Sequence, residues 1–406
     1  EMCIRDRRSS IKADLHRRDF TINTLAIRLD SGHYGELLDF YGGEQDLKDG
    51  QIRVLHSLSF IEDPTRIMRA ARFEQRLGFE IEPRTAELID NALPMLSRVS
   101  GERIRHELYL ILHESQPERV FCRLDSLGAL AHIHPRLACL EKTWELFPSL
   151  RETIASGQWD IPAEEDGRPP PGLYLALLTY DLPRRELETL TNRLKIFRDD
   201  LSLLHQVLDL REREPVLDKP VLSNREIYAL LRYASTSALM IHWLCTQSER
   251  VRQRLWQYEQ ELRHIQPVVD GTYLKSLGLK PSPLFSKLLH AVRDARLDGV
   301  IHTEEEEKAL ITHLLQEEKE REAGELENER RRRERQQKED QDRLERLYEE
   351  DKLRQEALRS QRQAEQERRD RLLREQEEER RRDEDEARLS LERKKAEHKQ
   401  EEEAFE

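Results

Sequence analysis

The stretch from residue 301 to the end constrains the fold most, because it contains too few apolar side chains to build a core. It holds 37 acidic and 27 basic residues among 106. Its apolar positions are too sparse to maintain the a/d seam of a coiled coil over several heptads. Glu and Arg recur three and four residues apart, and each such pair stabilises an isolated helix by about 0.2–0.5 kcal/mol. We therefore predict a solvated single helix over 303–406, with disorder and a weak coiled coil as the alternatives.

The first 300 residues are the part of the chain that can bury a core. A chain of 406 residues is long enough for two or three domains. The first 300 residues carry 45 acidic and 42 basic side chains, so this part is close to neutral. A nucleic-acid partner therefore has to be inferred from a local cluster of charge rather than from the net charge.

Cysteine usage and hydropathy exclude several classes of protein. The four cysteines, Cys3, Cys122, Cys139 and Cys245, form no C-x-x-C pair and are too scattered for a disulfide framework or a zinc site. A reduced, cytoplasmic setting is therefore expected. No run of about 18 apolar residues occurs, so we predict no membrane span.

The spacing of apolar residues predicts a mainly α fold that begins with a short α/β segment. Residues 19–30 fit either a short helix or a strand, and residues 51–55 fit a strand. From Pro64 onward apolar residues recur at helical spacing, and Gly78 is expected to end the first of these helices. Amphipathic helical patterns continue over 116–265.

A helix predicted over 62–76 carries a row of positive charge. Four arginines fall within an arc of roughly 120° on this helix: Arg66, Arg69, Arg72 and Arg76. Like charges at this spacing destabilise a helix, so the row favours an anion such as a nucleoside triphosphate or an RNA phosphate. The alternative is a surface row that Glu62, Glu74 or a neighbouring helix neutralises.

Asp63 has two interpretations of its own. An Asp followed by Pro is a common helix start, in which the carboxylate accepts from backbone N–H groups. Alternatively Asp63 and Arg66, three residues apart, face the same ligand. The run Arg17-Arg18-Asp19 by itself also has an alternative interpretation, which is a solvated cluster of ion pairs.

These runs carry a resemblance to a known family. Arg17-Arg18-Asp19-Phe20-Thr21-Ile22-Asn23 and, further on, Glu62-Asp63-Pro64-Thr65-Arg66 resemble the nucleotide-binding motifs of the bacterial tRNA nucleotidyltransferase and poly(A) polymerase family. Val99-Ser100-Gly101-Glu102-Arg103-Ile104 resembles the last motif that the family shares. The resemblance covers about residues 9–300 and is most specific over 14–110.

The resemblance implies a division of the chain and a role for each part. It implies a remnant of an α/β nucleotidyltransferase head at 1–55 and a helical neck at 56–115 that selects nucleotide and binds RNA. A helical body and tail at 116–302 would bind tRNA, and the charged helix at 303–406 lies outside the resemblance.

The resemblance also implies which side chains meet the ligands. The nucleotide-binding residues would be Arg18, Asp19, Asp63, Arg66, Arg69 and Arg72. The RNA-binding residues would be Arg76, Lys275 and Lys280. In the family, the Asp that matches Asp63 accepts from the exocyclic amine of adenine or cytosine, and the Arg that matches Arg66 donates to the neighbouring ring nitrogen. Guanine and uracil present the reverse pattern, which would leave charged groups without partners.

The implied activity is transfer of AMP, and possibly CMP, from ATP or CTP to the 3′ hydroxyl of tRNA or another RNA, with release of pyrophosphate. Two Mg²⁺ ions held by carboxylates normally assist such chemistry. In the family those carboxylates sit well upstream of the first motif, which only sixteen residues precede here. We therefore predict that the metal-holding part of the head is missing, that no residue here is catalytic or a metal ligand, and that the chain is inactive alone.

The alternative function is a non-catalytic RNA-binding helical module with a charged-helix spacer. Addition of A, of CC and of CCA all remain open.

Overall fold

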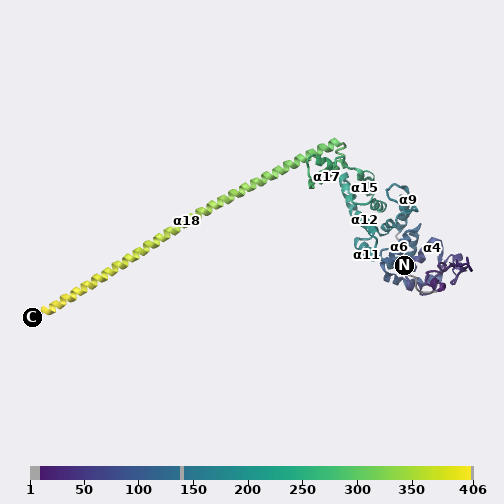
Figure 1. Ribbon diagram of the computed structural model, residues 1–406, viewed down its shortest axis with the longest axis horizontal. Helices are drawn as coiled ribbons and strands as arrows, with labels where there is room; N and C mark the ends of the chain where they lie inside the picture. Colours follow the sequence, from purple (N-terminus) through teal and green to yellow (C-terminus); the bar gives the residue numbers. More distant parts are fainter. Residues whose placement is uncertain (1–9, 138–140, 404–406) are drawn as a thin grey trace. The chain divides into compact units, whose positions relative to one another are not determined.

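The computed structural model describes residues 10–137 and 141–403. Helices dominate these residues, and the strands are only two residues long (Figure 1). This confirms the predicted mainly α class. The chain divides into two compact units, Glu1–Leu310 and Ile311–Glu406. No described helix is both long enough and apolar enough to cross a membrane.

The N-terminal segment of the first unit is a small α/β arrangement. Its elements are α1 (Ile11–Leu15), η1 (Thr21–Thr24), β1 (Ala26–Ile27), β2 (Leu37–Leu38), α2 (Gly43–Asp49) and β3 (Gln51–Ile52). Strands β1 and β2 pair in antiparallel fashion, and β3 pairs in parallel with β4 (Glu80–Ile81). Residues 19–30, which fitted either a helix or a strand, contain both a 3-10 turn and a short strand.

Helix α2 holds the first motif in place. The hydroxyl of Thr21, in η1, donates to Asp46 of α2 across 2.7 Å. A Cβ at Gly43 would lie 2.3 Å from the carbonyl oxygen of Thr21, so only glycine allows this approach. The turn that follows Arg18 and Asp19 is therefore fixed against α2.

The helix predicted over 62–76 is interrupted near its start. Helix α3 spans Ser59–Glu62 and α4 spans Thr65–Leu77. Asp63 is extended between them, with φ −140° and ψ 91°, because the residue before a proline is restricted to extended conformations. Gly78 ends α4, as predicted, and the structure shows it in the left-handed conformation.

Helices make up the rest of the first unit, and most of them share one hydrophobic core. They are α5 (Pro83–Ala92), η2 (Leu93–Arg98), α6 (Gly101–Leu112), α7 (Pro117–Ser126), α8 (Ala129–Ile133), α9 (Glu141–Ser156), α10 (Pro171–Thr179), α11 (Arg184–Leu194), α12 (Arg198–Leu217), α13 (Asn224–Leu231), α14 (Thr236–Cys245), α15 (Glu249–Gln260), η3 (Leu262–His264), α16 (Gly271–Ser276) and α17 (Pro283–Leu297). Helix α10 is buried on nearly all sides and contacts α9, α12 and α14. Cys245 is buried and Cys122 half-buried, whereas Cys3 and Cys139 lie outside the described residues.

The charged C-terminal segment is one helix, α18 (Glu304–Glu403). Residues 319–396 are all exposed, and pairs such as Arg331–Glu327, at 2.7 Å, join its successive turns. The first unit extends beyond residue 302. Glu307 is fully buried and accepts from the backbone N–H groups of Val268 and Val269 at 3.2 and 2.7 Å.

Candidate nucleotide-selecting site

The two motifs meet at one shallow pocket of about 440 Å³. Its lining consists of Arg17, Arg18, Asp19, Asn23, Asp63, Arg66, Arg69 and Phe73. Five of the six side chains predicted to bind nucleotide are therefore brought together, and Arg72 is the one outside the lining. Arg17, Asn23 and Phe73 were not among the predicted ligands, although Arg17 and Asn23 belong to the first motif.

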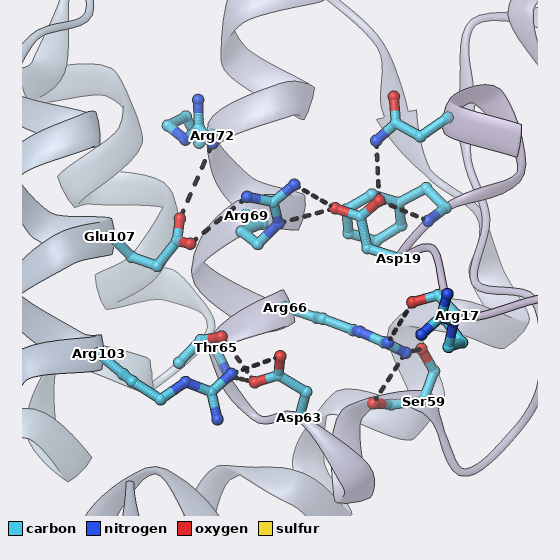
Figure 2. A network of polar contacts seen from close by, with 12 residues as sticks. Arg17, Asp19, Ser59, Asp63, Thr65, Arg66, Arg69, Arg72, Arg103 and Glu107 are labelled. Carbon is cyan, nitrogen blue, oxygen red and sulfur yellow. Dashed lines mark hydrogen bonds and ion pairs between the residues drawn. The ribbon is translucent and has the colours of Figure 1, made fainter. Parts of the chain in front are cut away.

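Asp19 is the most strongly bound carboxylate of the pocket. It accepts from the side-chain amide of Asn23 at 2.9 Å and from Nε and Nη2 of Arg69 at 2.7 and 2.6 Å (Figure 2). Burial by itself would raise its pKa. The hydrogen bonds from Asn23 and Arg69 and the Arg69 charge outweigh that effect, so the pKa of Asp19 is lowered.

The arginine row of α4 is largely neutralised by α6 and the residues just after it. Arg69 Nη1 lies 3.4 Å from Glu107, and Arg72 lies 3.8 Å from Glu107 and 3.3 Å from Glu114. Arg72 is only 6% exposed. Exposed Arg76 lies 3.8 Å from Glu114. The alternative in which a neighbouring helix neutralises the row therefore describes Arg72 best.

The Asp63 carboxylate matches the helix-start interpretation at only one of its two oxygens. One carboxylate oxygen, Oδ1, accepts from the backbone N–H and hydroxyl of Thr65 at 3.2 and 2.7 Å, as a helix-starting Asp would. The other, Oδ2, accepts from Nη2 of Arg103, on α6, at 2.7 Å. The carboxylate is therefore not occupied by backbone alone.

Arg66 extends away from Asp63 in Figure 2. Its Nη1 donates to the Ser59 hydroxyl at 2.6 Å, and its Nη2 donates to the carbonyl oxygen of Arg17 at 3.2 Å. Within the described part of the chain no carboxylate forms an ion pair with Arg66. Arg17 and Arg18 pair with Asp14, Arg18 at 3.9 Å. The pocket thus presents a guanidinium whose charge has no anionic partner among the described residues.

The two predicted RNA-binding lysines lie outside this pocket. Lys275 belongs to α16, and Lys280 lies in the turn before α17. Both side chains are exposed.

The described residues do not fit a magnesium site. Over 10–137 and 141–403, no three His, Cys, Asp or Glu side chains are grouped so that they could hold a metal ion. Asp19, the most buried carboxylate of the pocket, is already paired with Arg69. No step that uses a metal is therefore derived from these residues.

Two family profiles match the chain. The profile described as the poly A polymerase head domain matches residues 3–53. The profile described as a probable RNA and SrmB-binding site of polymerase A matches residues 78–140.

Two relatives match a longer part of the chain than these profiles do. The A-adding tRNA nucleotidyltransferase of Geobacter sulfurreducens is 37% identical over 316 residues, which is 76% of this chain and 36% of that protein. The A-adding tRNA nucleotidyltransferase of Halalkalibacterium halodurans is 32% identical over 304 residues, which is 74% of this chain and 67% of that protein. The chain thus spans about a third of the length of the Geobacter relative.

Two solved structures of CCA-adding enzymes are also similar to this chain. The Thermotoga maritima CCA-adding enzyme complexed with tRNA superimposes with a TM-score of 0.59 at 30% identity, covering 76% of this chain and 75% of that one. A CCA-adding enzyme in complex with CTP superimposes with a TM-score of 0.60 at 30% identity, covering 75% and 72%. The chain belongs to the class II tRNA nucleotidyltransferase and poly(A) polymerase family, which confirms the resemblance drawn from its motifs.

Proposed function

We propose that this chain selects adenine and cytosine nucleotides for addition to the 3′ end of RNA. The observation that carries the proposal is a pocket lined by both motifs, to which Asp63 and Arg66 each contribute a side chain. The A-adding relatives and the CCA-adding enzyme with CTP support the same class of substrate.

Base selection follows from the hydrogen-bonding groups of this pair. An ionised carboxylate only accepts and a guanidinium only donates. Adenine offers the N6 amine beside the N1 acceptor, and cytosine offers the N4 amine beside the N3 acceptor. Guanine and uracil place a carbonyl oxygen beside a ring N–H, which would face Asp63 and Arg66 with the wrong polarity.

The other pocket residues take complementary roles in the proposal. Arg18 and Arg69 meet phosphate oxygens, for which guanidinium geometry is suited. Asp19, whose two oxygens already accept from Phe20 N–H, Asn23 and Arg69, holds Arg69 in place beside the nucleotide. Arg72, which lies outside the lining, acts by holding Glu107 against Arg69 rather than by touching nucleotide.

RNA binding and location complete the proposal. Arg76, Lys275 and Lys280 contact RNA phosphates, and tRNA is the RNA favoured by the names of the relatives.

The divisions at 1–55, 56–115, 116–302 and 303–406 stand as proposed functional parts, in a cytoplasmic protein. Mg²⁺ is the proposed cofactor, with ATP or CTP as substrate. The inactivity of this chain alone stays a prediction, which a primer-extension assay with Mg²⁺ and a tRNA lacking its 3′ end would check.

Nucleotide binding by the full chain tests the proposed selection. Dissociation constants would be measured for ATP, CTP, GTP and UTP with the wild type, Asp63→Ala and Arg66→Ala. We expect ATP and CTP to bind about tenfold or more tightly than GTP and UTP, because a mismatched base leaves buried polar groups unpaired. Both substitutions should remove the difference.

Arg119→Ala is the matched control, because Arg119 is an exposed arginine on α7 outside the pocket. Equal binding of all four nucleotides by the wild type would contradict the proposed selection. RNA binding that persists in that case would favour the non-catalytic RNA-binding module.

A further inference from the structure

We infer that Arg103 is a positioning residue for base selection, which holds the Asp63 carboxylate in the orientation that meets the base. The inference rests on the proposed function of Asp63. Arg103 itself does not line the pocket, so its effect on a nucleotide would be exerted through Asp63.

The contacts around Asp63 fix both carboxylate oxygens. Thr65 holds Oδ1 through two donors, and Arg103 holds Oδ2 at 2.7 Å. Donors on both oxygens restrict rotation of the carboxylate about its terminal torsion, which is otherwise broad. Each carboxylate oxygen has about two lone-pair sites, so Oδ2 keeps one acceptor direction free. The Asp63 side chain is 25% exposed and lines the pocket, so a ligand can reach the carboxylate.

Arg103 is presented by a helix whose start is fixed to the rest of the helical core. A Cβ at Gly101 would lie 1.6 Å from the carbonyl oxygen of Arg193, near the end of α11. The Lys195 side chain forms an ion pair with Glu102, and the carbonyl oxygen of Lys195 accepts from Arg105. The first turn of α6 is therefore held by the end of α11, and Arg103 extends from this turn to Asp63 (Figure 2).

Arg103 should affect the orientation of the Asp63 carboxylate without affecting the stability of the fold. The Arg103 side chain is 55% exposed, and ion pairs at exposed positions contribute little to the free energy of unfolding. Loss of Arg103 should thus leave the fold intact. It would free Asp63 to turn away from the base, which reduces discrimination between bases and leaves the phosphate contacts unchanged.

The test compares Arg103→Met, Arg103→Lys and the control Arg119→Met in the full chain. For each protein the dissociation constants of ATP and GTP would be measured, together with the melting temperature. We expect Arg103→Met to lower the GTP-to-ATP ratio of dissociation constants by about tenfold, chiefly by weakening ATP binding. Arg103→Lys, which keeps a cationic donor, should retain part of the ratio. The control ratio and all melting temperatures should stay at the wild-type values.

A ratio that Arg103→Met leaves unchanged or increases would overturn the inference, because Arg103 would then be neutral or a competitor for Asp63. The double variant Asp63→Ala/Arg103→Met should discriminate no worse than Asp63→Ala alone. Asp63→Ala also separates the two proposals. If it leaves discrimination intact, the proposed function and the inference fail together. If it removes discrimination and Arg103→Met does not, only the inference fails.

Discussion

At the scale of single residues, the pocket is organised by pairs of carboxylates and arginines. Asp19 binds Arg69, Glu107 lies between Arg69 and Arg72, and Asp63 binds Arg103. Opposite charges in partly buried positions hold one another at fixed distances, which is what a nucleotide site requires of its ligands. Arg66 differs, since among residues 10–137 and 141–403 only hydroxyl and carbonyl oxygens accept from it.

The lowered pKa of Asp19 predicts a pH dependence of stability. Its folded pKa lies below its ordinary value of 3.8, so its ionised form stabilises the fold above that pH. The contribution is lost as the pH falls through the lowered pKa. Urea unfolding of the wild type and Asp19→Asn, from neutral pH to below 3.8, should show a difference in free energy that shrinks at the acidic end. The exposed Asp125→Asn serves as control, and a difference independent of pH would contradict the prediction.

At the scale of elements, the close approach of α6 to α11 depends on Gly101. Added atoms that cannot be accommodated force the backbone to move, which costs about 1–3 kcal/mol. We therefore expect Gly101→Ala to lower the free energy of unfolding by about that amount, because its Cβ would overlap the carbonyl of Arg193. Thermal or urea unfolding measures the effect.

Gly324→Ala is the matched control for Gly101→Ala. Gly324 lies in α18 with nothing within 4 Å of an added Cβ, and alanine favours a helix interior by roughly 0.5–1 kcal/mol over glycine. It should not destabilise the protein. Equal responses of the two variants would show that the α6–α11 contact does not depend on glycine.

At the scale of the whole molecule, the first unit includes the beginning of α18. Glu307 is fully buried, accepts from two backbone N–H groups and pairs with Arg296. A chain that ends after residue 302 loses these contacts and leaves Arg296 unpaired, whereas one that ends after residue 325 keeps them. We expect the first truncation to lower the melting temperature by several degrees and the second to leave it unchanged. Equal melting temperatures for the two truncations would contradict this.

Much of this protein follows from its sequence alone. Spacing of apolar residues predicts the helical class, Gly78 predicts the end of α4, and Glu and Arg three and four residues apart predict the single helix of α18. These features depend on neighbours within a few positions. The order of the motifs at Arg17–Asn23 and Glu62–Arg66 indicates the family. Asp19 and Arg69 line one pocket, whereas their contact with a nucleotide stays a prediction from these motifs.

Only the tertiary structure decides which charges meet. Arg72 appears in the sequence as one of four equivalent arginines, yet in the fold it is buried beside Glu107 and Glu114. Likewise, nothing near Asp63 in the sequence indicates that Arg103, forty residues later, holds its carboxylate. The physical reason is that ion pairs of this kind form between elements, so the partner depends on how α4 and α6 pack rather than on local spacing.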